Sequence, residues 1–306
     1  MSAEHSSLLT INSIAEQHQL LGLAKPDHPL ISIIEFDDIA PWDLPEPISF
    51  VNKFYTITLK SKCDANEKYG RSAHDFDQGL MNFCAPEIKR KLDANDHLPE
   101  KGWMLSFHPD FLLDHFLNDK IKELGFFRYQ INEALHLSPK EEQMIARVLD
   151  NIKQEYLSII DAYSQDIILA QVEVLLHYAN RFYNRQFITR KTINTELLTK
   201  LNAVLDEYFK DEVLMKSGLP SVKLISEKMN ISSNYLSDLL RKMTGQNTQQ
   251  HIQNRTISKA KELLLTTNLS VNEIAYHLGF EHPQSFHKVF KNRTKISPLG
   301  FKHSFN

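Results

Sequence analysis

Two sets of polar side chains recur at matching positions near the carboxyl end of the chain, about fifty residues apart. The first set is Asn234, Ser237, Asp238 and Arg241, and the second is Gln284, Ser285, His287, Lys288 and Lys291. Amides, hydroxyls and long basic side chains are the groups that bond to base edges and phosphates. The residue types therefore indicate contact with nucleic acid, provided that the fold presents each set on one surface.

A repeated sequence pattern predicts the elements that position these sets. Residues 222–231 resemble residues 271–280 at an offset of 49, and after this stretch the offset becomes 50. Each copy has a small residue at the expected helix crossing (Ser226, Ala275) and then a residue that tolerates positive φ (Asn230, Gly279). The pattern predicts two helix-turn-helix units, with Ser232 and Ser233 capping the second helix of the first unit.

Apolar residues on each second helix predict which side faces inward. They are Leu236, Leu239 and Leu240 in the first copy, and Phe286, Val289 and Phe290 in the second. The polar sets then face outward, which suits the major groove. The alternative is a pair of plain helical hairpins with solvated polar faces.

The segment between the copies predicts a rigid spacer. Residues 248–265 contain no proline or glycine, and eighteen helical residues span about 27 Å. This length would place the two reading helices near one duplex turn apart, about 34 Å.

The charge of the chain is divided unevenly. From Met215 onward there are thirteen basic and five acidic residues, net +8, and the remainder has 22 basic and 33 acidic residues, net −11. We therefore expect only the carboxyl end to meet a polyanion.

The amino-terminal part is expected to be β-rich and then helical. Strand-like runs cover residues 31–36, 50–59, 80–84 and 103–107 and favour a small antiparallel barrel or sandwich. Helical periodicity follows from Pro139, with Ser138 as N-cap, then over 167–182 and from Thr195. The first two helices are interpreted either as ordinary core or as a dimerisation surface. The fold class is α+β, with an all-α carboxyl-terminal domain.

The carboxyl-terminal residues resemble those of AraC/XylS-type transcriptional regulators. The resemblance rests on Gly279-Phe280-Glu281, Ser285-Phe286, Val289-Phe290-Lys291, Ser297-Pro298 and Phe301-Lys302, and on residues 232–237 with Thr244-Gly245. Residues 75–79 and 103–109 more weakly resemble the cupin-like regulatory domains of some members. The resemblance implies a cupin-like sensory domain at 1–138, a helical dimerisation or linker segment at 139–194, and a DNA-binding domain at 195–306.

The resemblance also implies partners and the roles of the two sets. The first set would read one major groove of double-stranded DNA and the second set the next, in a cytoplasmic homodimer that answers to a small-molecule effector and contacts RNA polymerase. Three residues depart from the family pattern. Lys295 stands where glycine is usual, Asp238 where a basic residue is common, and Lys288 where arginine is usual. Asp238 could accept from a cytosine amino group or pair with Arg241 or Lys242.

A metal-dependent enzyme is the alternative for the amino-terminal domain, because cupin-like barrels can bind metals. The candidate ligands are His74, Asp75, Asp77, His97 and His108. They lack the closely spaced histidine pair that such sites need. No phosphate-binding glycine loop or nucleophile motif is found, so we expect no enzyme activity, cofactor or metal.

The remaining features point to an ordinary cytosolic protein. Cys63 and Cys84 are expected to be free thiols. We expect no membrane span, and no secretory signal in the first ten residues.

Overall fold

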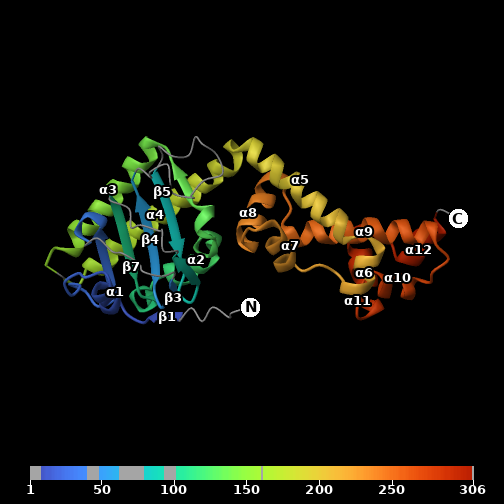
Figure 1. Ribbon diagram of the computed structural model, residues 1–306, viewed down its shortest axis with the longest axis horizontal. Helices are drawn as coiled ribbons and strands as arrows, with labels where there is room; N and C mark the ends of the chain where they lie inside the picture. Colours follow the sequence, from blue (N-terminus) through green and yellow to red (C-terminus); the bar gives the residue numbers. More distant parts are fainter. Residues whose placement is uncertain (1–7, 40–47, 62–78, 93–100, 160, 305–306) are drawn as a thin grey trace. The chain divides into compact units, whose positions relative to one another are not determined.

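The chain folds into two compact units, Met1–Gln186 and Phe187–Asn306, each described here by itself (Figure 1). The computed structural model describes residues 8–39, 48–61, 79–92, 101–159 and 161–304. The first unit contains β-sheets and helices, whereas the second is helical, as the α+β expectation requires. None of the helices in these ranges combines the length and apolar character needed to cross a membrane.

A five-stranded antiparallel sheet forms the centre of the first unit, with strand order β2-β7-β4-β5-β8. A smaller sheet has the order β1-β3-β6, with β1 parallel to β3. The strands are β1 (Leu8–Ile11), β2 (Ile31–Glu35), β3 (Ile48–Asn52), β4 (Tyr55–Lys60), β5 (Gly79–Cys84), β6 (Lys89–Leu92), β7 (Gly102–Phe107) and β8 (Leu135–Leu137). The four predicted runs are all strands, except that the run over 50–59 is divided between β3 and β4.

Alternation along the strands gives the large sheet one strongly apolar face. Ile33, Leu105, Ile57 and Phe83 are aligned in register across four strands, and all are buried. Helix α3 (Pro139–Tyr156) packs against β2. Burial of each of these four apolar side chains stabilises the fold by about 1.5–3 kcal/mol.

Polar contacts fix the edge where α3 meets the sheet. Lys153 of α3 forms an ion pair with Glu35 of β2 and lies 5.4 Å from the centre of the Trp103 ring of β7. The start of α3 is as predicted. Ser138 is the N-cap and forms a reciprocal capping box with Glu141.

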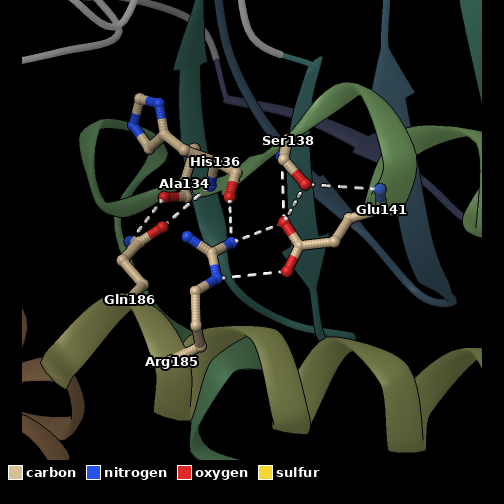
Figure 2. A network of polar contacts seen from close by, with 6 residues as sticks. All are labelled: Ala134, His136, Ser138, Glu141, Arg185 and Gln186. Atoms are coloured by element: carbon tan, nitrogen blue, oxygen red, sulfur yellow. Dashed lines mark hydrogen bonds and ion pairs between the residues drawn. The ribbon is translucent and has the colours of Figure 1, made fainter. Parts of the chain in front are cut away.

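Helix α4 (Ser164–Thr189) is joined to the β8 segment by the network in Figure 2. Arg185 donates to both carboxylate oxygens of Glu141, at 3.1 and 2.9 Å, and to the carbonyl oxygen of His136 at 2.7 Å. Gln186 accepts from the backbone N–H of His136 at 2.9 Å and donates to the carbonyl of Ala134 at 3.2 Å. These bonds attach α4 to β8 and to the start of α3.

Shorter elements complete the first unit. They are α1 (Ile14–Leu20), α2 (Leu117–Glu123) and 3-10 turns at Phe36–Asp38, Pro109–Leu112, Gly125–Arg128 and Ile131–Glu133. Cys84 at the end of β5 is a free thiol, as expected, and Cys63 lies outside the described residues.

The second unit consists of two long helices, α5 and α9, and several shorter ones. The helices are α5 (Lys191–Tyr208), α6 (Asp211–Ser217), α7 (Val222–Met229), α8 (Ser233–Thr244), α9 (Thr248–Thr266), α10 (Val271–His277), α11 (Pro283–Thr294) and α12 (Pro298–His303). Helix α5 begins four residues before the predicted Thr195. The Asn194 side chain donates to the carbonyl of Phe187 at 2.6 Å and is buried inside the helix start instead of preceding it.

Candidate nucleic-acid interface

The first predicted helix-turn-helix is formed by α7 and α8. Asn230 ends α7 in the left-handed conformation, with φ 57° and ψ 44°, as the turn requires. Ser232 then caps α8 by accepting from the backbone N–H of Tyr235 at 3.1 Å. The small residue at the crossing, Ser226, is buried, and its hydroxyl lies 2.7 Å from that of Ser233. This bond joins the two helices directly.

The second helix-turn-helix is formed by α10 and α11. Gly279 supplies the turn with φ 81°, and Ala275 at the crossing is fully buried. A Cβ atom on Gly279 would lie 2.5 Å from the Cα of Gly218, which precedes α7 and also has positive φ. The two glycines therefore allow the backbone that precedes α7 to contact the turn between α10 and α11. Sequence reasoning identified Gly279 but not Gly218.

Helix α9 connects the α7–α8 pair to the α10–α11 pair, as predicted for the spacer. Asn247 and Gln250 form a capping box at its start. Its nineteen residues correspond to about 28 Å. The helix contacts α7, α8, α10, α11 and α12, so it is the central support of the second unit.

The first predicted set lies on the outer side of α8, opposite three buried leucines at 236, 239 and 240. Of this set only Arg241 is exposed, whereas Asn234, Ser237 and Asp238 are half-buried. The Ser237 hydroxyl lies 3.0 Å from that of Thr248, so it also holds α9. Arg241 donates to the carboxylate of Asp238 at 2.8 Å, which is one of the two interactions considered for Asp238.

The second predicted set lies on α11, whose buried side carries Phe286 and Phe290. The remaining residue predicted to face inward, Val289, is only half-buried. Gln284, Ser285, Lys288 and Lys291 are exposed, and His287 is half-buried. In the part of the chain that the structure describes, no acidic side chain forms an ion pair with Lys288 or Lys291. The outer side of α11 is therefore positively charged.

Helix α11 ends at an unusual residue. Lys295 is the C-cap in the left-handed conformation, with φ 68°, a position that favours glycine. Just before it, Arg293 donates to Gln253 of α9 at 2.8 Å. The basic end of α11 is thus both strained in its backbone and attached to the central helix.

A polar contact that the sequence did not indicate joins α6, α9 and α10. Asp211 accepts from Nε2 of His277 at 3.1 Å and lies 3.2 Å from Nζ of Lys259. The hydrogen bond from His277 is the main reason that the pKa of Asp211 is lower than its ordinary value. The contact helps to orient α10 beneath the second turn.

The family model of a helix-turn-helix domain matches residues 225–304, which extend from within α7 to beyond the end of α12. Residues 225–304 therefore form a helix-turn-helix domain. The chain is similar to an uncharacterised HTH-type transcriptional regulator, YfiF of Bacillus subtilis, with 32% identity over 184 residues, 60% of this chain and 55% of the relative. It is also 28% identical over 135 residues to the transcriptional activator RhaS of Salmonella schwarzengrund, 44% of each chain. The chain thus matches about half the length of these curated relatives.

Solved structures of AraC-type and related domains are also similar to this segment. The carboxyl-terminal domain of the response regulator yesN from Fusobacterium nucleatum has 32% identity and covers 33% of this chain and 93% of its own, with a TM-score of 0.29. The DNA-binding domain of AdpA, solved with a target DNA, has 21% identity and covers 36% of this chain and 91% of its own, with a TM-score of 0.31.

The metal alternative gains no site among the described residues, where no group of three histidine, cysteine or acidic side chains is found. His108 lies 3.4 Å from Asp110 of the same turn. The other candidate ligands, His74, Asp75, Asp77 and His97, lie outside the described residues.

Proposed function

We propose that the chain is a sequence-specific transcriptional regulator that reads two adjacent major-groove segments of promoter DNA. One observation supports this most strongly. The helix-turn-helix domain contains two helix pairs whose second helices, α8 and α11, each bury an apolar side and expose a side able to form hydrogen bonds. A helix of this kind fits the major groove, where base edges present donors and acceptors.

The spacer supports reading of both segments by one chain. Helix α9 contacts α8 and α11, and its length of about 28 Å is close to the 34 Å or so of one duplex turn. In this proposal Asn234, Ser237, Asp238 and Arg241 face one groove. The residues that face the next groove are Gln284, Ser285, His287, Lys288 and Lys291.

The amino-terminal unit is proposed as the regulatory part. Residues 1–138 would form a cupin-like sensory domain, and residues 139–194 a helical segment that supports a homodimer. A small-molecule effector would act in the cytoplasm by binding one arrangement of the protein better than another, with RNA polymerase as a further partner. Sedimentation that shows only monomer at micromolar concentration, with and without DNA, would refute the dimer.

The test of the function is selection of bound duplexes from a random pool with the full chain, followed by footprinting at moderate salt. We expect a site with two conserved blocks about one helical turn apart. Absence of any enriched sequence and of any protected region would refute the proposal.

Lys288→Ala separates two ways in which α11 could bind. If Lys288 contacts a base, binding weakens by about 1–3 kcal/mol, and preference changes in one half of the site only. If it contacts a phosphate, all sequences lose affinity alike, and the slope of log K against log salt falls by about 1. Lys210→Ala is the control, because Lys210 is exposed, pairs with Glu207 and lies between α5 and α6.

A further inference from the structure

The two reading helices have outer sides of different charge. On α8, Asp238 and Arg241 neutralise one another through their 2.8 Å contact. Fifty residues later the corresponding positions of α11 are Lys288 and Lys291, both exposed. Equivalent positions of one duplicated unit thus provide an ion pair in the first copy and two cations in the second.

The ion pair lies where an acidic residue is unfavourable for general DNA binding. Asp238 is on the outer side of α8, and its side chain is 30% exposed, while that of Arg241 is 58% exposed. A carboxylate near phosphates weakens binding to every sequence, because most non-specific affinity comes from neutralised phosphates. An exposed pair of this spacing stabilises a helix only slightly. Its position is better explained by discrimination between bases than by affinity or stability.

We propose that Asp238 and Arg241 together read one C·G base pair. In the major groove, cytosine presents its N4 amino donor, and its partner guanine presents two acceptors, O6 and N7. The Asp238 carboxylate accepts from N4, while the Arg241 fork donates to O6 and N7. The contact between the two side chains keeps acceptor and donor side by side. This inference rests on the proposed function.

The other base pairs satisfy the ion pair less well. A reversed G·C pair places acceptors opposite Asp238 and the amino group opposite Arg241. In an A·T pair, adenine presents an amino group that Asp238 could bind. Thymine, however, presents only one acceptor, O4, beside a methyl group, so the Arg241 fork lacks its second acceptor. A good paired contact of this kind discriminates by about tenfold or more.

The experiment uses the full chain, sites selected from a random pool, and binding measured on each site and on its substituted forms. We expect one C·G position at which the original protein loses about tenfold or more on substitution. Asp238→Ala should weaken that preference without abolishing it, because Arg241 still recognises guanine. The variant should bind the substituted sites more tightly than the original protein does, with a steeper salt dependence. Asp238→Asn should move the preference toward adenine, whose edge matches an amide.

Modified DNA and a matched control isolate the two contacts. Replacing the guanine by 7-deazaguanine should weaken the original protein but leave Arg241→Ala unchanged. Glu262→Gln is the control, since Glu262 forms a 2.8 Å pair of the same spacing with Lys259 on α9, and it should keep the preference.

The possible failures are distinct from one another. If the selected sites have no position whose preference changes in Asp238→Ala, the inference is wrong while the DNA-binding function stands. A uniform loss of binding by Asp238→Ala together with a lower unfolding temperature would also overturn it, because the pair would then be structural. If no sequence is selected at all, the proposed function itself fails.

Discussion

Substitution of Gly279 by alanine tests whether the close approach of two backbones holds the second helix-turn-helix in place. The added Cβ would lie 2.5 Å from the Cα of Gly218 and 2.8 Å from the backbone nitrogen of Leu219. Both are backbone atoms, so no flexible side chain can move aside. The residue also has φ +81°, a conformation that costs an L-residue about 1–2 kcal/mol.

The expected loss combines two effects. Overpacking of a tight contact adds about 1–3 kcal/mol to the cost of the positive φ, so Gly279→Ala should lower the free energy of unfolding by about 2–5 kcal/mol. Gly245→Ala is the matched control, because Gly245 has φ +74° and no atom within 4 Å of the added Cβ. Only the conformational cost applies there.

Scanning calorimetry and urea unfolding followed by far-ultraviolet circular dichroism measure both variants. The two compact units can unfold separately, so hydrogen exchange should confirm that the loss is in α10 and α11. Equal destabilisation by the two substitutions would show that the Gly218 contact adds nothing and would refute the reasoning.

Three further substitutions test local contacts. Lys295→Gly should raise the unfolding free energy by about 0.5–1 kcal/mol, because Lys295 has φ 68°; calorimetry that shows a loss would contradict this. The hydrogen bond from His277 lowers the pKa of Asp211 below its ordinary value of 3.8. The hydrogen bond therefore stabilises the folded state fully above pH 3.8, and this stabilisation is lost as the pH falls through the pKa of Asp211 in the folded protein. The original protein should therefore exceed Asp211→Asn in stability at pH 7, by less than about 1 kcal/mol since the site is half-exposed. The difference should shrink as the pH is lowered below 3.8, and a difference that does not change with pH would argue against the carboxylate. Arg185→Lys should cost about 1–3 kcal/mol, because an ammonium cannot reproduce the two-pronged bond to Glu141; an unchanged urea midpoint would contradict it.

Local sequence patterns predicted the helix-turn-helix geometry well. Asn230 and Gly279 both have the positive φ that was inferred for the turns, and Ser138 and Ser232 both act as caps. These features depend on residues only a few positions apart, so the local sequence is enough to predict them. The positive φ of Lys295 could not be inferred in this way, because lysine has no preference for that conformation.

Features that depend on distant residues were not predictable. The contact of Gly218 with Gly279 joins residues sixty-one positions apart, and neither glycine specifies the other. Strand β6 has the sequence Lys-Arg-Lys-Leu, which lacks an apolar alternation, and β8 (Leu-His-Leu) alternates but has only three residues, too few to be recognised. Strand β6 forms because it pairs with β3, and β8 forms because it pairs with β5. On α8 and α11 the buried apolar residues were predicted from the sequence, with the exception of Val289, whereas the pairing of Asp238 was left open.

The placement of Trp103 beside Lys153 has a practical consequence for spectroscopy. The chain has two tryptophans, Trp42 and Trp103, and neither lies in the second unit, so indole emission does not originate there. Of the two, Trp103 is among the residues that the structure describes. The ammonium group 5.4 Å from the Trp103 ring centre makes that emission sensitive to any shift of α3 against β7. An oligonucleotide titration observed at this wavelength would therefore show, without an added label, whether occupancy of the basic unit is transmitted to the sheet.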